Sequence, residues 1–569
     1  MRKIPYGISY FPTLVQDGYY YVDRTAYIAR LENSGDRQVF FLRPRRFGKS
    51  LWISTLQHYY GKGYEEIFET TFGDYYIGQH PTPLRNQYLM MVLDFSGINT
   101  DTPESTYDGF LRKVIYGGKN LLLQYSSFFS EADIPELEAQ KTPEGVIEYL
   151  SVLIKEKAKD HKIYLLIDEY DHFANELISF RQSDFQDMVG GNGFVRKFYE
   201  AVKTATRDGA IDRMFVTGVS PLTLDSLTSG FNIARNLSSD PEFYDMMGFH
   251  ETEVSAILQN IGVTEQELPL QLDLLRRWYN GYRFSEAGNR MYNPDMILYY
   301  TGYYSRNHKL PANMLDHNIL SDYGKIRRLF QIGDKEHERL LLLDQLLTDE
   351  RVGVSLTTQF SFERNFTESD FLSLLFYMGI LTIDNVERGQ LQLRIPNEVI
   401  RQLYFQYFHQ VLEEESQQRL AESFKYKAIS DFAYDNNPEP LMQIVAEVLE
   451  QLSNRDWIRF DEKHIKTVLI SYLYQSPLYY IKSEYETGQK YVDLLLLRRP
   501  PYDPKYQFAL ELKYLAKKDE TQLQKVAEEA RQQLKAYLQK EELYALPDLK
   551  AWLVIFVGNE YRVMEEVVK

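Results

Sequence analysis

The sequence predicts a mixed α/β protein built from several domains, and three observations support this expectation. The chain has 569 residues, more than the ~100–200 residues of a typical single domain. Before residue 220, short apolar runs alternate with stretches of helical periodicity, and similar runs return near the C-terminus. The composition, 44% hydrophobic and 25% charged, is that of a folded globular protein rather than a disordered or fibrous one.

Four apolar runs in the N-terminal part are expected to be strands. Each is almost continuously apolar, which is typical of strands that are covered on both faces. The helical stretches between them favour a parallel sheet between two layers of helices, a three-layer α/β domain. The expected strands are Val39–Leu42, Leu89–Leu93, Tyr164–Ile167 and Met214–Thr217.

Downstream of this domain the pattern changes to helices and then returns to strands. Residues from about 250 to 350 have mostly helical periodicity. Residues 366–411 give two helices around a hairpin, Ile380–Ile395, with Arg388-Gly389 at its turn, an outline that is similar to a winged helix. The elements expected near the C-terminus are a helix, two strands, a polar helix and a last strand, at Glu462–Leu473, Tyr491–Leu497, Phe508–Leu512, Glu520–Tyr544 and Ala551–Val557.

The composition excludes several classes of site. The chain has no cysteine, so disulfides, thiolate zinc sites and cysteine nucleophiles are excluded, and a reducing compartment is expected. The net charge of −17 argues against nonspecific coating of nucleic acid. The longest apolar run, Ala551–Val557, is far shorter than the ~20 residues of a membrane span, and no signal peptide is recognised. We therefore expect a cytoplasmic protein with no membrane partner.

A phosphate-binding loop is expected directly after the first strand. The segment Arg43-Pro-Arg-Arg-Phe-Gly48-Lys49-Ser50 precedes an apolar-periodic helix, Leu51–Tyr60. A helix N-terminus that follows such a loop offers backbone N–H groups to a phosphate. Gly48 belongs to this turn, Lys49 would reach the β- and γ-phosphates, and the Ser50 hydroxyl would ligate Mg²⁺.

Three arginines depart from the usual glycine pattern of such a loop. Arg43 and Arg46 stand where glycines are common, and Arg45 lies between them. They either form a solvated rim of the loop or supply charge-assisted contacts to phosphate oxygens. We favour phosphate contacts, because solvation alone does not call for three arginines beside Lys49.

Polar residues follow two further strands of the same predicted sheet. Asp168 and Glu169 follow the third strand, where Asp168 suits the shell of Mg²⁺ and Glu169 can polarise an attacking water. A solvated strand end is the alternative. The fourth strand ends at Thr217, with Ser220 shortly after it, and these two hydroxyl residues are expected to sense a γ-phosphate. The bound cofactors would be ATP and Mg²⁺.

Residues 1–300 resemble the AAA-ATPase-like family. The resemblance implies a P-loop ATPase core with a helical lid, in which Arg283 is a candidate lid arginine. Beyond the loop itself, the segments that carry it are Tyr20–Thr25, Leu93–Ser96, Gly218–Leu222, Leu227–Asn232, Trp278–Phe284 and Tyr292–Pro294.

Charged residues interrupt two apolar strands near the C-terminus. Glu511 and Lys513 share one face of their strand because residues i and i+2 point the same way. Asp493, Glu511 and the Leu512 carbonyl would form a hard oxygen shell for Mg²⁺, and Lys513 would act on the attacking water or the phosphodiester. The alternative is an edge strand whose charges pair with one another.

Residues 456–557 resemble the PD-(D/E)xK nuclease superfamily, in the version fused behind AAA-ATPase-like domains. Asp493, Glu511 and Lys513 match its catalytic strands, although Val492 stands where a proline is usual. The resemblance implies that Glu462 is the first-helix glutamate and that Gln533 is a helix glutamine near the site. Glu484 is a competing acidic ligand, for which a structural role is favoured.

These expectations combine into four domains and one leading function. The domains are an AAA-ATPase-like domain (1–249), a helical lid (250–350), a helical, winged-helix-like connector (351–455) and a nuclease-like domain (456–569). The leading function is ATP-dependent or ATP-regulated, Mg²⁺-dependent cleavage of nucleic acid, DNA more than RNA. The alternative is a regulatory or signalling NTPase whose nuclease fold is inactive and serves binding. The sequence leaves the oligomeric state open.

Overall fold

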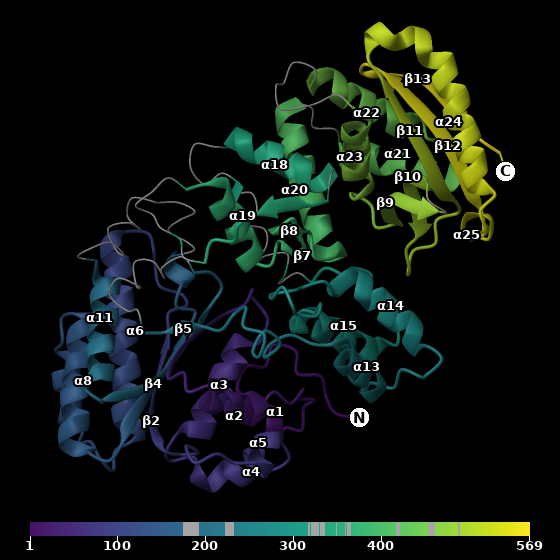
Figure 1. Ribbon diagram of the computed structural model, residues 1–569. Coiled ribbons are helices and arrows are strands. Elements are labelled where there is room, and N and C mark those ends of the chain that lie inside the picture. The colour runs from purple at the N-terminus through teal and green to yellow at the C-terminus, as the bar shows by residue number, and fades with distance from the viewer. Residues whose placement is uncertain are drawn as a thin grey trace. The chain divides into compact units, whose positions relative to one another are not determined.

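A computed structural model of the chain describes residues 1–174, 193–221, 233–316, 319, 329–330, 336–348, 350–358, 360, 366–416, 421–452, 461–487 and 490–568 (Figure 1). The chain forms two compact units, each assembled from two segments. Unit 1 contains residues 1–309 and 351–398, and unit 2 contains residues 310–350 and 399–569. The motif Leu227–Asn232 lies outside the described residues.

A parallel sheet forms the centre of unit 1. Its strand order is β2-β3-β4-β1-β5, and each of these neighbouring pairs is parallel. The four predicted strands are confirmed, and the short β5 was not predicted because it spans only two residues. The strands are β1 (Gln38–Leu42), β2 (Tyr88–Asp94), β3 (Lys162–Asp168), β4 (Ile211–Gly218) and β5 (Arg235–Asn236).

Helices cover both faces of this sheet, which confirms the predicted three-layer arrangement. Figure 1 shows α6 (Pro103–Gln124), α8 (Pro143–Lys157) and α11 (Phe194–Arg207) on one face and α3 (Lys49–Tyr60) on the other. The smaller helices of this region are α1 (Phe11–Gln16), α2 (Ala26–Asn33), η1 (Glu65–Ile67), α4 (Phe68–Phe72), α5 (Tyr76–Gln79) and α7 (Asp133–Glu138).

Unit 1 also contains three helices after the sheet and a small antiparallel sheet. The helices are α13 (Glu251–Asn260), α14 (Leu268–Tyr279) and α15 (Pro294–Asn307). The small sheet has the order β6-β8-β7, and the predicted hairpin is confirmed. Arg388 and Gly389 form its turn with positive φ angles of 51° and 80°, as a two-residue hairpin turn requires. The elements here are β6 (Val352–Val354), α19 (Glu368–Tyr377), β7 (Thr382–Glu387) and β8 (Gln390–Arg394).

Unit 2 contains a helical part and a mixed sheet of order β13-β12-β11-β10-β9. Strands β11 and β12 are parallel and the other neighbours are antiparallel. The helices are α18 (Glu336–Thr348), α20 (Glu398–Ser416), α21 (Glu422–Asp435), α22 (Glu439–Leu452), α23 (Glu462–Leu473), η2 (Lys517–Gln522), α24 (Leu523–Leu538) and α25 (Glu541–Tyr544). The strands are β9 (Tyr479–Thr487), β10 (Lys490–Arg498), β11 (Gln507–Leu515), β12 (Leu549–Val557) and β13 (Glu560–Glu566).

The secondary structure predicted for the C-terminal region is corrected in three places. The predicted helix Glu520–Tyr544 is divided, because Lys540 is extended between α24 and α25. Strand β13 follows the strand that was predicted to be the last, and β9 precedes β10. Both added strands are rich in charged residues and tyrosine, so neither forms an apolar run.

The division into units differs from the predicted domain boundaries at 350 and 455. The hairpin region packs with the N-terminal part: a Cβ on Gly379 would lie 2.7 Å from Pro44, and one on Gly281 would lie 2.0 Å from the Pro396 carbonyl oxygen. In unit 2, by contrast, Nδ1 of His464 lies 3.3 Å from Asp344 of α18. Contacts between residues so far apart in the sequence cannot be predicted from local composition.

Two helix-interior glycines of unit 1 provide a matched test of this packing. A Cβ added to Gly117 in α6 would lie 2.3 Å from Leu93 Cδ2 and 3.0 Å from the Val92 carbonyl oxygen of β2, whereas one on Gly302 in α15 meets nothing closer than 3.8 Å. Gly117→Ala is therefore expected to destabilise the protein by about 1–3 kcal/mol through overpacking. Gly302→Ala should stabilise it by about 0.5–1 kcal/mol through helix propensity. Calorimetric unfolding measures both, and equal effects would contradict the described packing of α6.

Candidate functional site

The loop between β1 and α3 has the backbone shape of a phosphate-binding loop. Arg46 and Gly48 both adopt positive φ angles, 66° and 92°, a region that non-glycine residues seldom occupy. Gly48 is the N-cap of α3, and within the part of the chain that the structure describes no side-chain hydrogen bond caps this end. The first N–H groups of α3 therefore remain available to an anion at the positive end of the helix dipole.

A cavity of about 370 Å³ opens at this helix N-terminus. Such a volume is within the range of small-molecule sites, about 300–1,000 Å³. Gly48, Lys49 and Ser50 line its polar end, and apolar side chains line much of the rest. Those other lining residues include Ile8, Leu14, Tyr20, Tyr21, Val22, Trp52, Met246, Met247, Phe249 and Leu298. The combination of an apolar pocket and a phosphate-binding loop fits a nucleoside triphosphate.

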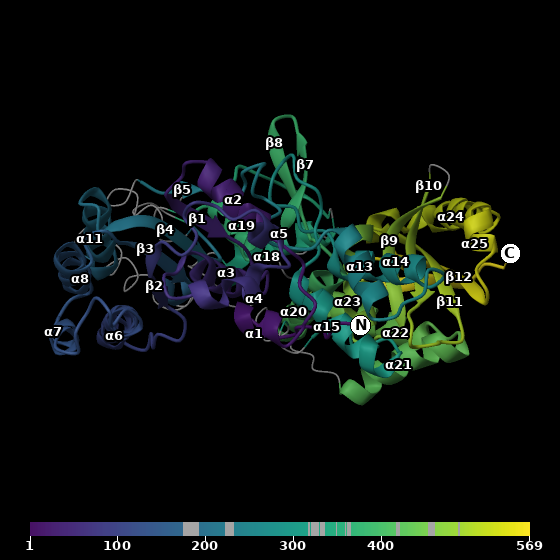
Figure 2. The same ribbon diagram turned by 90° about the horizontal axis from the view of Figure 1, so that it is seen from below.

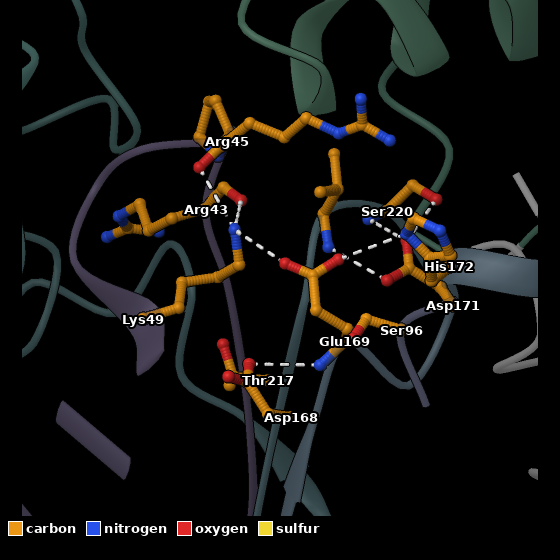
Figure 3. Close-up of polar contacts among 12 residues, drawn as sticks. Arg43, Arg45, Lys49, Ser96, Asp168, Glu169, Asp171, His172, Thr217 and Ser220 are labelled. Carbon is orange, nitrogen blue, oxygen red and sulfur yellow. Dashed lines mark hydrogen bonds and ion pairs between the residues drawn. The ribbon is translucent and has the colours of Figure 1, made fainter. Parts of the chain in front are cut away.

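Lys49 lies almost completely buried at the polar end of the cavity, with 4% of its surface exposed. Its ammonium donates to the carbonyl oxygens of Arg43 and Pro44, both at 3.2 Å, and lies 3.9 Å from Glu169 Oε1. Figure 3 shows the ammonium between the loop and the Glu169 carboxylate. The Lys49 ammonium can therefore exchange these carbonyl and carboxylate partners for phosphate oxygens of a ligand without first becoming exposed to water.

Asp168 ends β3 and Glu169 follows it directly, next to the loop, as the sequence predicts. Burial together with the negative charge of Glu169 raises the pKa of Asp168 to about 6, and the nearby Ser50 hydroxyl opposes this rise. Burial alone would also raise the pKa of Glu169, but the charge of Lys49, with His172 and Arg45, lowers it to about 2. The structure thus joins the two residues expected to ligate Mg²⁺, Ser50 and Asp168, and keeps Glu169 ionised.

The structure contradicts the phosphate-binding role expected for Arg43. Its side chain is buried, and its guanidinium donates to the carbonyl oxygens of Leu42, Ser238 and Tyr244. It also stacks on two aromatic rings, Phe41 and Phe284, at 4.2 and 4.3 Å. Burial lowers the pKa of Arg43 to about 9. Arg43 therefore holds the base of the loop.

Arg45 and Arg46 stay near the cavity, so a phosphate contact remains a prediction for both. The charge of Arg45 acts on Glu169, and Figure 3 shows its side chain extending past the Glu169 carboxylate. Arg46 lines the cavity and pairs with Asp295 at 3.4 Å.

The two residues expected to sense a γ-phosphate, Thr217 and Ser220, are fully buried and occupied elsewhere. The Thr217 hydroxyl donates to the Phe41 carbonyl oxygen at 2.8 Å, and the Ser220 hydroxyl donates to Asp171 at 2.9 Å. Both hydroxyls donate to buried oxygen atoms of the protein itself, which corrects the prediction.

Arg283 is also placed away from the cavity. Its guanidinium donates to the carbonyl oxygens of Ser285, Asp384 and Glu286. It fastens the β7–β8 hairpin instead of serving as a lid arginine.

Sequence reasoning gave no role to Asp171 and His172. Asp171 is completely buried and accepts hydrogen bonds from the backbone N–H groups of Val219 and Ser220, at 3.0 and 2.7 Å. It ties the segment after β3 to the segment after β4. His172 Nδ1 lies 3.6 Å from Glu169 Oε2. The dense run of charges after Asp168 was the signal available, but spacing alone does not say which carboxylate is buried.

The second candidate site lies in unit 2 and brings four of the predicted residues together. The Lys513 ammonium lies 3.0 Å from Glu511 Oε1, 3.2 Å from Glu462 Oε1 and 3.4 Å from Asp493 Oδ2. It also donates to the Leu512 carbonyl oxygen at 3.0 Å. The backbone N–H of Leu512 donates to Asp493 Oδ2 at 2.8 Å, which fixes that carboxylate across β10 and β11.

Glu511 is the most deeply buried residue of this second site, with no exposed surface. Among the described residues, neither of its carboxylate oxygens accepts a hydrogen bond of normal geometry, but Oε1 pairs with the Lys513 ammonium at 3.0 Å. Burial and the charge of Asp493 raise the pKa of Glu511 to about 7, and the same two causes raise the pKa of Glu462. Burial would lower the pKa of Lys513, but its three carboxylates raise it.

The helix glutamine, Gln533, is near this site without touching the carboxylates. Its amide donates to the Tyr537 hydroxyl, and the charges of Glu511, Asp493 and Lys513 all act on that hydroxyl. Tyr537 is a residue that the sequence reasoning missed. Glu484 is in β9, but its side chain lies outside the described part of the chain, so its role stays a prediction.

The expected Mg²⁺ ligands of the second site are in place, but Lys513 lies among them. Asp493, Glu511 and the Leu512 carbonyl supply hard oxygen atoms, and the unsatisfied oxygens of Glu511 suit a cation. Within the described residues, however, no three acidic or histidine side chains converge as a metal site would require. Mg²⁺ therefore fits only if the ammonium leaves the Leu512 carbonyl and the carboxylates rearrange.

The role of Lys49 can be tested by nucleotide binding. Lys49→Ala removes a charged donor that phosphate oxygens would otherwise contact, and such a bond contributes about 1.5–3 kcal/mol. We expect roughly 10- to 150-fold weaker ATP binding in titration calorimetry.

Two variants control this experiment. Lys155→Ala removes an exposed lysine that pairs with Asp208, and it should bind ATP as the unaltered protein does. Glu169→Gln should retain ATP binding but slow hydrolysis by roughly 100-fold or more, because an amide does not polarise water. Equal ATP affinity in Lys49→Ala and Lys155→Ala would refute the phosphate-binding loop.

The ion-pair cluster of the second site predicts a stability effect. Lys513→Met leaves Glu511, Asp493 and Glu462 without their shared cation, and removing one partner of a buried pair costs about 3–5 kcal/mol. Exposure of Glu462, at 38% of its side chain, should reduce the loss to about 2–3 kcal/mol. Chemical unfolding of the full chain measures it, with exposed Lys525→Met as the control. A loss no larger than that of the control would show that the carboxylates do not depend on Lys513.

Comparisons with known proteins match the two regions of the chain in which these sites lie. Residues 5–228 match the family model described as a predicted AAA-ATPase, and residues 460–566 match that of the PD-(D/E)XK nuclease superfamily. An uncharacterized protein in the vnfD 5′ region of Azotobacter chroococcum mcd 1 is 26% identical over 404 residues, 70% of this chain and 68% of that protein.

Among solved structures, the Walker-type ATPase PABY2304 of Pyrococcus abyssi is similar with a TM-score of 0.37 and 12% identity, over 71% of this chain and 98% of that one. No helix of the described residues has the length and apolar character that crossing a membrane requires. The family matches confirm both resemblances seen in the sequence: the chain carries an AAA-ATPase-like domain and, near its C-terminus, a domain of the PD-(D/E)XK nuclease superfamily.

Proposed function

We propose that the protein binds ATP with Mg²⁺ in unit 1 and cleaves phosphodiester bonds of nucleic acid in unit 2, with ATP controlling the cleavage. One observation supports the nuclease half above all others. Glu511 is a fully buried carboxylate that pairs with the Lys513 ammonium at 3.0 Å and accepts no hydrogen bond of normal geometry among the described residues. An arrangement so costly to bury is retained more readily where a cation or substrate uses it.

In the ATP site, each residue would act on a different part of the nucleotide. The N–H groups at the start of α3 and the Lys49 ammonium would hold the phosphates, while Ser50 and Asp168 would hold Mg²⁺. Mg²⁺, when bound, supplies positive charge against the phosphate oxygens. Glu169, ionised and 22% exposed at its side chain, would orient and polarise the attacking water, and His172 would hold the Glu169 carboxylate from its other side.

In the nuclease site, Asp493, Glu511 and the Leu512 carbonyl would hold Mg²⁺. The metal, when bound, supplies positive charge at the scissile phosphate. Lys513 would then turn from the carboxylates toward a phosphate oxygen or the attacking water. Glu462, 38% exposed, would lie between the metal and solvent. Tyr537, which accepts a hydrogen bond from Gln533, would lie near the carboxylates.

A second candidate function rests on the position of Lys513. The ammonium occupies the centre of the carboxylates, and no cluster of three acidic side chains suited to a metal occurs among the described residues. A nuclease fold that has lost its metal and serves only to bind nucleic acid or a protein would keep this internal ion pairing. The protein would then be a regulatory NTPase.

Cleavage assays separate the two functions. We expect the purified full-length protein to cut plasmid DNA with Mg²⁺, and ATP to change the rate. Asp493→Ala and Glu511→Ala should each abolish cutting and leave ATP binding intact, whereas Lys49→Ala should remove only the effect of ATP. Absence of cleavage of both DNA and RNA, at several Mg²⁺ and ATP concentrations, would leave the regulatory function.

A further inference from the structure

An excess of arginine surrounds one buried carboxylate on the β7–β8 hairpin of unit 1. Asp384, 6% exposed at its side chain, contacts Arg351 at 2.8 Å, Arg290 at 3.0 Å and Arg394 at 3.4 Å. Arg283 donates to the backbone carbonyl oxygen of the same residue at 2.8 Å. We refer to Asp384 with Arg283, Arg290, Arg351 and Arg394 as the arginine cluster.

The arginine cluster carries more positive charge than fastening the hairpin requires. One guanidinium neutralises one carboxylate, and Arg283 already holds the hairpin through backbone carbonyls and through its own N–H to the Thr382 hydroxyl. Within residues 283–290, 351–354 and 382–394, five arginines accompany three acidic residues, an excess of two positive charges. Mutual repulsion among such cations destabilises a folded protein, so structure alone does not explain them.

The geometry leaves donors of the arginine cluster available to a ligand. Arg351 and Arg290 are 54% and 48% exposed at their side chains. Asp384 pairs with Nε of Arg351 and accepts a hydrogen bond from one terminal nitrogen of Arg290. A guanidinium has five N–H donors in a planar fork that matches phosphate oxygens.

The β7–β8 hairpin places part of the arginine cluster next to a projecting turn. In Figure 2 the turn between β7 and β8 projects from the neighbouring elements of its unit, and Arg388 is exposed at that turn. The other exposed residues of the turn, from Asn385 to Gln390, are the polar Asn385 and Gln390, the acidic Glu387, Gly389 and the apolar Val386. A narrow, projecting, arginine-bearing hairpin fits against the groove or backbone of a nucleic acid better than against an acidic globular surface.

We infer that the arginine cluster is a contact surface for the phosphodiester backbone of nucleic acid. This inference rests on the proposed function, because the bound molecule would be the substrate of the nuclease site. A chain of net charge −17 cannot use its surface at large for this purpose, so a few concentrated contacts must provide the electrostatic part of binding. Each phosphate contact contributes about −0.9 to the slope of log K against log salt concentration.

The salt dependence of binding tests this inference in the full-length protein. Fluorescent 30-base-pair DNA and RNA duplexes are titrated without Mg²⁺, so that nothing is cut. We expect a slope of about −3 to −5 for the unaltered protein. Arg290→Gln with Arg351→Gln should reduce its magnitude by about two and weaken binding roughly tenfold per arginine at 0.1 M salt. Arg394 remains to pair Asp384 in this double variant.

Two matched variants make the outcome specific. Arg276→Gln with Arg207→Gln removes the same charge from two exposed, ion-paired arginines elsewhere in unit 1, and the slope should hardly change. Arg290→Lys with Arg351→Lys retains the charge and should retain the slope. If Arg290→Gln with Arg351→Gln instead has the same slope as the Arg276/Arg207 control, while the unaltered protein binds, this inference is wrong and the nuclease proposal is unaffected. If the unaltered protein binds neither duplex, the proposed nucleic-acid substrate is wrong, and this inference with it.

Discussion

A lysine ammonium surrounded by oxygen atoms organises each of the two candidate sites, and its side chain is 4% exposed at Lys49 and 22% exposed at Lys513. An unpaired buried charge costs several kcal/mol, so the fold must surround the ammonium with oxygen atoms. At Lys49 these are two loop carbonyls and Glu169. At Lys513 they are one carbonyl and three carboxylates. The bend of the loop after β1 and the pairing of β10 with β11 both satisfy this requirement.

The two lysines have opposite electrostatic surroundings, which suits different ligands. Around Lys49 the negative charge belongs to Glu169 and Asp168, and the helix N-terminus adds positive potential that favours an anion. Around Lys513 three carboxylates outnumber one ammonium, which favours an added cation. Asp171 contributes to the first arrangement from a distance, because it holds the ends of β3 and β4 together through backbone N–H groups.

Local patterns were sufficient to predict the elements that carry these sites, but not the direction of several side chains. Continuous apolar runs located the four long strands of the first sheet, and the i, i+2 rule placed Glu511 and Lys513 on one face. The guanidinium of Arg43 turned toward the carbonyls of Ser238 and Tyr244, about 200 residues away, and no local pattern records that contact. The role predicted for Thr217 and Ser220 was wrong for the same reason, because their hydroxyls donate to Phe41 and Asp171, which are distant in the sequence. The charge-rich strands β9 and β13 gave no apolar run to detect.

The most direct measurement of the central claim is a crystal structure of the full-length protein with a non-hydrolysable ATP analogue and Mg²⁺. The account predicts phosphates at the N-terminus of α3, with the Lys49 ammonium moved from the carbonyls of Arg43 and Pro44 onto the β- and γ-phosphates, and Mg²⁺ beside Ser50 and Asp168. A nucleotide bound elsewhere, or a Lys49 that keeps its carbonyl partners while ATP is bound, would contradict it.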